Sequence, residues 1–308
     1  MTKTALFYHE DCVLHDMGEG HPESPLRLRF ILDHLNQTGL LQDMDRVTPE
    51  EARKQQILNV HPATYVEQLS LLAPARGRVM VDPDTLLMQH SLRAAYLAAG
   101  AAVQAVDMVM SGQADTAFCA VRPPGHHAER SRAMGFCFFN NVAIAAMHAM
   151  TFHNLKRIAI IDFDVHQGNG TIDIFMDDPR VLICSSFEYP LYPYSHVNVR
   201  RDHVVNTPLE AYTKGGQFRR RVESEWLHRL QNHKPQLILV SAGFDAHKLD
   251  PLSSIELEER DYRWVTRMLA DIARIYSKGR IVSILEGGYN LHALARSVEY
   301  HIEGLMGN

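Results

Sequence analysis

The sequence contains little cysteine and no segment that would direct export. Its four cysteines, Cys12, Cys119, Cys137 and Cys184, form no CxxC pair and no dense cluster of the kind found in a disulfide framework. The opening residues MTKTALFYHE carry no apolar stretch of the kind found in a secretory signal peptide. We therefore expect reduced thiols and a cytoplasmic protein.

Long apolar runs and an excess of basic charge are also missing. The apolar runs are short and interrupted, so we expect no membrane-spanning segment. The 31 basic and 36 acidic residues give a net charge of −5, which argues against a dedicated nucleic-acid-binding protein. The glycines form neither a GxGxxG nor a P-loop pattern, so nucleotide binding is not expected.

What the sequence does contain is a series of short apolar runs typical of buried strands. Hydrophobic residues make up 46% and charged residues 22% of the chain, which is ordinary for a globular protein with a sizeable core. Several runs are continuous rather than alternating, as in strands buried on both faces of a parallel sheet. The predicted strands are TALFYH, TAFCAV, RIAIIDFDV, RVLICSSF, QLILVSAGF and RIVSILEG.

Helical patterns occupy the segments between these strands. The run that follows Ser24-Pro25 ends at Gly39, and Thr48–Glu51 has the form of a capping box, which predicts a helix start. Further helices are predicted at 91–110, 140–152, about 215–231 and 256–276. Strand and helix alternate without a linker or an internal repeat. We therefore predict one domain over residues 1–308, with a doubly wound, mostly parallel α/β sheet flanked by helices.

Polar residues follow four of the predicted strands. RPPGHH follows TAFCAV, DFDVHQGNG follows RIAII, SAGFDAHKLDP follows QLILV, and EGGYN follows RIVSIL. Open parallel sheets bind ligands at the carboxyl ends of their strands. We therefore expect these four groups to form an active site at one edge of the sheet.

Asp164, His166 and Asp245 are the candidate metal ligands. Asp164 and His166 are two residues apart, so in an extended segment both would face the same side, and Asp245 arrives from another strand end. One imidazole nitrogen and two carboxylate oxygens make a three-ligand site with the open position that catalytic zinc needs. Because two of the three ligands are carboxylate oxygens, Fe²⁺ or Co²⁺ are alternatives to zinc at this site. The alternative is that the two aspartates only cap strand ends. It is the weaker account, because the sequence supplies all three ligand types together with the His126-His127 pair.

The adjacent histidines His126 and His127 are candidate acid–base groups. A partner on one ring nitrogen fixes the tautomer and raises the basicity of the other. Asp162 and Asn169 could supply such partners, one charged and one neutral, so one histidine could act as a base while the other stays cationic. Tyr289 suits an oxyanion role, because its hydroxyl could hydrogen-bond a developing negative charge, although a merely packed tyrosine is the alternative.

Four segments, in this order and spacing, resemble the zinc-dependent histone deacetylase family. They are RPPGHHAERSRAMGFCFFNN, IIDFDVHQGNGTIDIF, SAGFDAHKLDPL and EGGYN. The resemblance extends from near His21 to about Tyr289, and the sequence around Asn169 is similar to the class II branch and its bacterial relatives, which include acetylpolyamine amidohydrolases. It implies an arginase-like α/β fold and hydrolysis of acetylated amines.

The resemblance also implies a role for each candidate residue. Zinc would be bound by Asp164, His166 and Asp245. His127 would be the general base and acid with Asn169 behind it, and His126 would be the electrostatic partner backed by Asp162. Tyr289 would polarise the acetyl carbonyl.

A substrate tunnel and potassium sites are further implications of the resemblance. The substrate-binding residues would be Gly135, Phe136, Tyr192, Leu252 and, at the rim, Asp84. An inner potassium ion would be bound, partly through main-chain oxygens, by Asp162, Asp164, His166, Ser185 and Ser186. A second would involve Phe175, Asp178 and Val181.

Three positions bear on substrate choice. Gln167 stands where a second histidine is usual, and PLYPYSHVN replaces the more usual glycine-containing turn. Leu252 stands where polyamine-selective relatives carry a glutamate. We therefore expect removal of acetyl or related acyl groups from lysine in proteins or peptides, with acetylpolyamines or other small acetylated amines as the alternative substrates.

Two other classes of protein fit less well. An arginase-like two-metal hydrolase needs more ligands than the sequence offers near Asp164 and Asp245. A non-catalytic acetyl-lysine reader needs none of the acid–base groups. The sequence does not determine whether the protein forms a homo-oligomer.

Overall fold

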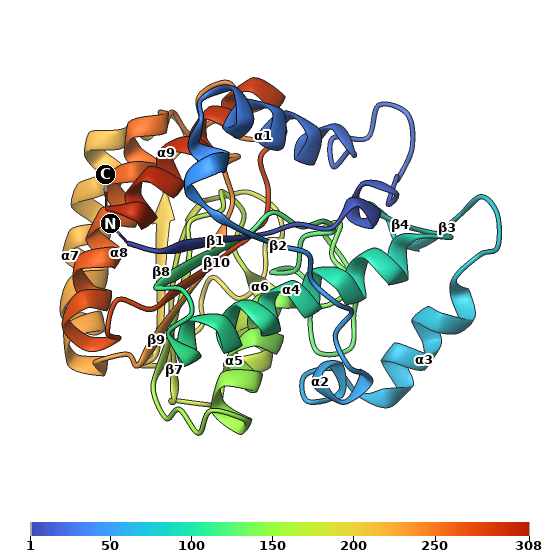
Figure 1. The fold of residues 1–308 in the computed structure, drawn as a ribbon, viewed down its shortest axis with the longest axis horizontal. Coiled ribbons are helices and arrows are strands. Elements are labelled where there is room, and N and C mark those ends of the chain that lie inside the picture. Colours follow the sequence, from blue (N-terminus) through green and yellow to red (C-terminus); the bar gives the residue numbers. More distant parts are fainter. Residues whose placement is uncertain (1, 308) are drawn as a thin grey trace.

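The computed structural model describes residues 2–307, which are arranged around one eight-stranded sheet (Figure 1). Every pairing within this sheet is parallel, and the strand order is β2-β1-β5-β10-β9-β6-β7-β8. The predicted fold class is confirmed. The strands are β1 (Thr4–Phe7), β2 (Asp45–Val47), β5 (Thr116–Cys119), β6 (Ile158–Asp162), β7 (Val181–Glu188), β8 (Val204–Leu209), β9 (Leu237–Ala242) and β10 (Ile281–Leu285).

Helices cover both faces of the sheet. On one face α4 and α5 lie side by side, and on the other α7, α8 and α9 pack in sequence, with α1 against α9 (Figure 1). A separate hairpin, β3 (Arg78–Asp82) with β4 (Thr85–Met88), lies outside the sheet. The helices are α1 (Leu26–Gln37), α2 (Lys54–Leu58), α3 (Ala63–Leu72), α4 (Ser91–Ser111), α5 (Asn141–Thr151), α6 (Asn169–Phe175), α7 (Gly215–His233), α8 (Glu259–Tyr276) and α9 (Leu291–Met306), with short 3-10 turns at Glu10–Val13 and Leu40–Asp43.

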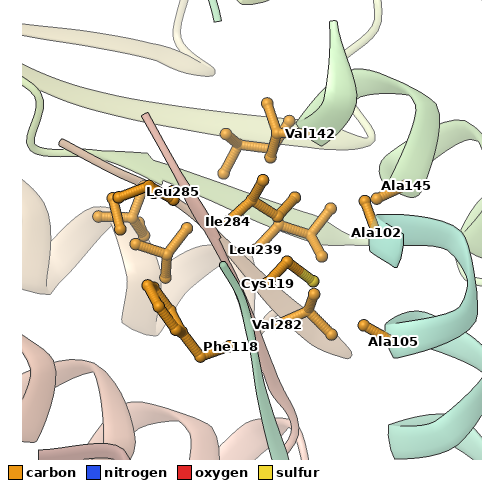
Figure 2. Close-up of a cluster of buried hydrophobic side chains, with 14 of the residues drawn as sticks. Ala102, Ala105, Phe118, Cys119, Val142, Ala145, Leu239, Val282, Ile284 and Leu285 are labelled. Carbon is orange, nitrogen blue, oxygen red and sulfur yellow. The ribbon is translucent and has the colours of Figure 1, made fainter. Parts of the chain in front are cut away.

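A cluster of buried hydrophobic side chains lies where α4 and α5 meet the central strands (Figure 2). Figure 2 shows Ala102 of α4 and Ala145 of α5 facing the side chains of β5, β9 and β10, while Phe118 points to the opposite face. These side chains are completely buried. Small residues on the helices let their backbones lie close to the sheet, where packing is as dense as in an organic crystal.

Among residues 2–307, α4 is the helix whose length and composition would allow it to cross a membrane. The sequence did not predict such a segment. However, 67% of its most apolar stretch is buried inside the protein, as is common for a core helix of a globular domain.

Two helix starts differ from their predictions. The capping box at Thr48–Glu51 is wrong, because residues 48–53 form no helix and α2 begins at Lys54. The backbone of this segment instead bonds to α4, with Ala52 N–H donating to the Tyr96 carbonyl at 2.9 Å and Gln104 donating to the Glu50 carbonyl at 2.9 Å. Pro25 is the N-cap of α1 rather than its first residue, a shift within the usual uncertainty of helix ends.

Candidate active site

The four strands whose ends carry polar residues are neighbours in the sheet. Their order is β5-β10-β9-β6, so the loops that follow them meet at one edge, as predicted. The strands end earlier than expected, β5 at Cys119 and β6 at Asp162, so the chemical groups lie on loops. Loops held by a rigid sheet are the usual place for catalytic residues.

Asp164, His166 and Asp245 converge at this edge. His166 Nδ1 lies 3.1 Å from Asp164 Oδ1 and 3.2 Å from Asp245 Oδ2, and all three side chains are buried. One ligand atom from each residue lies within 4.8 Å of the other two. Asp164 and His166 face one point because the loop folds back, with the His166 N–H donating to Asp164 Oδ1 at 2.9 Å, and not because they share a strand.

Backbone amides fix both carboxylates. The Gly287 N–H donates to Asp164 Oδ2 at 2.8 Å, and the Val165 N–H donates to Asp245 Oδ1 at 2.8 Å, so the remaining oxygens point at His166. A Cβ on Gly287 would lie 2.0 Å from Asp245 Oδ2. Only glycine therefore lets the EGGYN backbone come close enough to hold the site.

The electrostatics of this cluster fit a divalent cation. Burial raises the pKa of Asp245, and the neighbouring Asp164 carboxylate raises it further, because two close negative charges repel. Burial lowers the pKa of His166, but its hydrogen bonds to Asp164 and Asp245 outweigh that effect and raise the pKa to about 10. A positive charge is therefore favoured at this point. Two carboxylates and an imidazole are donors that zinc accepts, and a cation bound here would take the place of the proton on His166.

The two adjacent histidines have different partners. His126 Nδ1 lies 2.9 Å from Asp162 Oδ2, and His127 Nδ1 lies 2.7 Å from Asn169 Oδ1, while the ring centroids are 4.0 Å apart. Burial alone would lower the pKa of His126, but Asp162 and nearby carboxylates raise it well above its usual value. Burial and the adjacent His126 lower the pKa of His127 well below its usual value. These opposite shifts favour the cationic form of His126 and the neutral form of His127.

Aromatic residues surround the approach to this pair. Tyr192 meets His127 edge-on with centroids 5.1 Å apart, and Phe136 meets Tyr289 edge-on at 6.0 Å. Tyr289 is half-buried, and its pKa is raised well above the usual value by burial and by Asp245, so its hydroxyl stays protonated and can donate a hydrogen bond. Burial and the nearby charge of Asp84 also raise the pKa of Tyr192.

Gly135 and Asp84 hold this aromatic wall in place. Asp84 Oδ1 accepts a hydrogen bond from the Gly135 N–H at 3.0 Å. Gly135 has a φ of 57°, and a Cβ there would lie 2.4 Å from Cδ2 of His127, so its backbone rests directly on the imidazole. The structure thus brings the predicted rim aspartate and the predicted wall residues together beside His127.

Leu252 is connected to the site through its backbone. Its N–H donates to Asp250 Oδ1 at 3.0 Å, and Asp250 Oδ2 accepts from the Tyr289 N–H at 2.6 Å. The Leu252 side chain is half-buried. Asp250, which the sequence reasoning did not select, therefore positions both Leu252 and Tyr289.

Gln167 and the altered loop after Tyr189-Pro190 are parts of one hydrogen-bond chain. Gln167 Nε2 donates to Asn206 Oδ1 at 2.9 Å. Asn206 Nδ2 in turn donates to the carbonyls of His196 and Val197 at 3.0 and 3.1 Å. Gln167, the neighbour of the candidate metal ligand His166, therefore helps to place the loop that carries Tyr192.

Two buried charged residues that sequence reasoning missed support the site. Glu286 Oε2 accepts from the N–H groups of Gly125 and His126 at 2.7 and 3.1 Å, and burial raises its pKa to about 7. Arg27 donates to the carbonyls of Glu286 and Gly288, and its guanidinium lies 5.1 Å from the centre of the Tyr289 ring. A buried arginine in an otherwise apolar helical stripe was the signal available in the sequence.

The residues predicted to bind potassium lie in two places. Asp162 and Ser185 are opposite each other on β6 and β7, and the buried hydroxyl of Ser185 has no hydrogen-bond partner among residues 2–307. Ser186 follows on β7 and is also buried. Farther away, the Phe175 carbonyl accepts from the Asp178 N–H at 3.0 Å, and the Asp178 carbonyl accepts from the Val181 N–H at 3.1 Å.

Residues 21–305 match the family model described as the histone deacetylase domain. The chain is 34% identical over 312 residues to the histone deacetylase-like amidohydrolase of Pseudomonas aeruginosa, across 94% of this chain and 82% of that protein. It is 37% identical over 335 residues to the polyamine deacetylase HDAC10 of Mus musculus, across 99% of this chain and 48% of that protein. The crystal structure of the HDA15 HD domain aligns with a TM-score of 0.92 and 32% identity, covering 100% of this chain and 90% of that one. Several curated relatives are longer proteins, of which the chain spans half or less.

Proposed function

This chain belongs to the histone deacetylase family, and we propose that it is a zinc-dependent hydrolase that removes acetyl or related acyl groups from lysine side chains in proteins or peptides. The observation that carries the proposal is the convergence of three kinds of group. A cation-binding cluster, a divided histidine pair and a protonated tyrosine meet at one sheet edge. Amide hydrolysis needs a Lewis acid, a base and an oxyanion donor, and these groups could supply them.

The chain's own residues have distinct roles in this reaction. Zinc held by Asp164, His166 and Asp245 would lower the pKa of a water molecule to near ~7 and polarise the acetyl carbonyl. His127 is held by Asn169 through Nδ1, so its Nε2 is available to take the proton of the attacking water. His126 stays cationic against Asp162 and favours the developing negative charge. Tyr289 donates a hydrogen bond to the oxyanion, and a histidine returns a proton to the leaving amine.

The aromatic residues around His127 support a neutral, slender substrate. An acetylated lysine side chain carries no charge and could pass between Phe136 and Tyr192. Leu252 provides no carboxylate that would bind the distal ammonium of an acetylpolyamine. The second candidate, an acetylpolyamine deacetylase, is favoured by the 37% identity to a polyamine deacetylase.

An inner potassium site is a further part of the proposal. Ser185 supports it, because its buried hydroxyl has no hydrogen-bond partner among the described residues 2–307 and Ser185 is paired with Asp162 in the sheet register. The outer site at Phe175, Asp178 and Val181 has weaker support, because two of its carbonyls already accept hydrogen bonds from the chain.

Steady-state rates on two substrate classes test the proposed function. The same zinc-loaded preparation would be given an acetyl-lysine peptide and acetylated putrescine, spermidine and cadaverine. We expect a higher kcat/KM for the peptide. A preference for any of the polyamines would select the second candidate, and no hydrolysis of either class would contradict the proposed chemistry.

A further inference from the structure

A second group of potential metal ligands lies far from the sheet edge, on the outer side of α4 and α5. Nε2 of His148 lies 2.7 Å and Nε2 of His153 lies 2.6 Å from the same oxygen, Oδ1 of Asp107. One ligand atom from each residue lies within 4.8 Å of the other two. Asp107 is on α4, His148 is on α5, and His153 follows the end of α5, so three separate backbone positions converge.

The end of α5 is what brings the two histidines together. The helix ends at Thr151, and the chain then turns so that His153 comes back beside His148, with ring centroids 5.6 Å apart. Phe152 stacks on His148 at 5.1 Å and meets His153 edge-on at 5.0 Å. Phe152 therefore fixes both rings, although it is 67% exposed and contributes little to the core.

Asp107 has no cationic side chain of its own to balance it. It is one of only two charged residues in the apolar helix α4, the other being Arg93 fourteen positions away near the start of the helix. Within residues 2–307 no lysine or arginine pairs with Asp107, and its ion-pair partners are the two histidines. A carboxylate oxygen approached by two imidazole nitrogens is a donor set typical of zinc and related transition metals.

We propose that Asp107, His148 and His153 bind a divalent transition-metal ion of the zinc type. Zinc bonds of about 2.0–2.1 Å in a tetrahedron require ligand atoms about 3.3 Å apart, so the two N···O distances must open by about 0.6 Å. The Asp107 side chain is 43% exposed and can move that far. A cleft of about 370 Å³, whose lining includes Asp107 and His148 as well as Glu51 and Arg53, leaves room for water as the remaining ligand.

An ion at this site would join α4 to the end of α5 without touching the catalytic centre. The start of α5 is beside the histidine-pair loop, where Asn141 donates to the Pro123 carbonyl at 3.2 Å. The second site is at the other end of this 11-residue helix, about 16 Å away at 1.5 Å per residue. The ion would therefore stabilise the packing of two helices, and the inference does not depend on the proposed reaction.

Zinc stoichiometry under equilibrium dialysis tests this inference. We expect metal-free wild-type protein to take up two equivalents of zinc, and His153→Gln and His148→Gln to take up one each while keeping wild-type deacetylase rates. His34→Gln is a matched control, because His34 also faces a single carboxylate, Glu299, at 2.7 Å but belongs to no group of three potential metal ligands within residues 2–307. We expect this variant to retain both equivalents. An unchanged stoichiometry in both histidine variants, or an equal loss in the control, would overturn the proposal.

A second measurement identifies the ligands without substitutions. In a ring that binds zinc through Nε2, the remaining ring proton is on Nδ1, and no hydrogen bond to Nδ1 of His148 or His153 exists within residues 2–307 to oppose this. Long-range ¹H–¹⁵N spectra of the histidine rings during a zinc titration should show this tautomer change for both residues at the second equivalent. Unchanged signals from both rings at that point would also overturn the proposal.

Discussion

Two clusters use similar side chains in very different surroundings. The inner cluster is Asp164, His166 and Asp245 at the sheet edge, and the outer cluster is Asp107, His148 and His153 on α4 and at the end of α5. At the sheet edge, Asp164 and Asp245 are buried and each is fixed by a backbone amide. At the far end, Asp107 is 43% exposed, and its ion-pair partners within residues 2–307 are two histidines. The comparison teaches that ligand identity alone does not make a catalytic site. Beside the inner cluster lie a histidine pair and Tyr289, which could supply a base and an oxyanion donor, whereas the outer cluster is a partly exposed set of three potential ligands next to a cleft.

Removing an inner ligand should have the largest effect. Asp245→Ala, made in the His153→Gln background so that the outer site does not contribute, should lose its bound zinc and reduce kcat/KM by on the order of 10³-fold or more, since the ion supplies several kcal/mol of charge stabilisation. Metal content and rates would be measured on one preparation. A full equivalent of zinc retained in this double variant would contradict the assignment of Asp164, His166 and Asp245 as the ligands.

The divided histidine pair should be the next most sensitive feature. His127→Ala should lose on the order of 10²–10⁴-fold in kcat at neutral pH, because no other neutral group beside the site can act as the base. His126→Ala should lose less, since its charge assists the reaction without transferring the first proton. Parallel single-turnover rates would compare the two, and a larger loss for His126→Ala would reverse the roles.

Tyr289→Phe removes one hydroxyl from a site that is otherwise unchanged. The variant should fold, bind zinc and bind substrate, but kcat should fall by on the order of 10²–10³-fold because an oxyanion donor is lost. Circular dichroism and metal analysis would provide the controls. If kcat stayed within about threefold of wild type, the oxyanion role of Tyr289 would be wrong.

The smallest expected effect is on substrate choice. A carboxylate at the tunnel mouth attracts the distal ammonium of an acetylpolyamine, and about 1.4 kcal/mol from a partly screened ion pair corresponds to about tenfold. Leu252→Glu should therefore shift the polyamine-to-peptide ratio of kcat/KM by about tenfold. Leu252→Gln would control for size without charge. An unchanged ratio in Leu252→Glu would leave the loop around Tyr192 as the feature that determines selectivity.

The sequence predicted the inner cluster well for a physical reason. Buried parallel strands leave continuous apolar runs, and the polar residues after them must lie at one edge, so the positions of Asp164 and Asp245 followed from the pattern. The turn that brings His166 back to Asp164 was not predictable, because it depends on a loop hydrogen bond beyond the strand end. The false helix start at Thr48–Glu51 has a similar cause, since contacts with α4 override the local capping signal.

No pattern in the sequence predicted the outer cluster. Asp107 and His148 are 41 residues apart and belong to two helices whose faces are set by tertiary packing. Arg27 and Glu286 were missed for a similar reason, because the backbone groups that they hold are far away in the sequence: the carbonyls of Glu286 and Gly288 for Arg27, and the amides of Gly125 and His126 for Glu286. Local patterns therefore identify strand ends and short motifs, and they do not identify pairings between distant surfaces.

The hydrogen-bond chain from Gln167 through Asn206 has a consequence for protein engineering. Asn206 Nδ2 holds the carbonyls of His196 and Val197, and its Oδ1 accepts from Gln167, so the loop carrying Tyr192 is anchored by two residues outside it. A loop transplanted from a relative with a glycine-containing turn would leave these amides without partners, at a cost of about 1–3 kcal/mol for each unsatisfied buried group. Positions 167 and 206 therefore have to be exchanged together with residues 190–198 whenever this loop is moved between relatives.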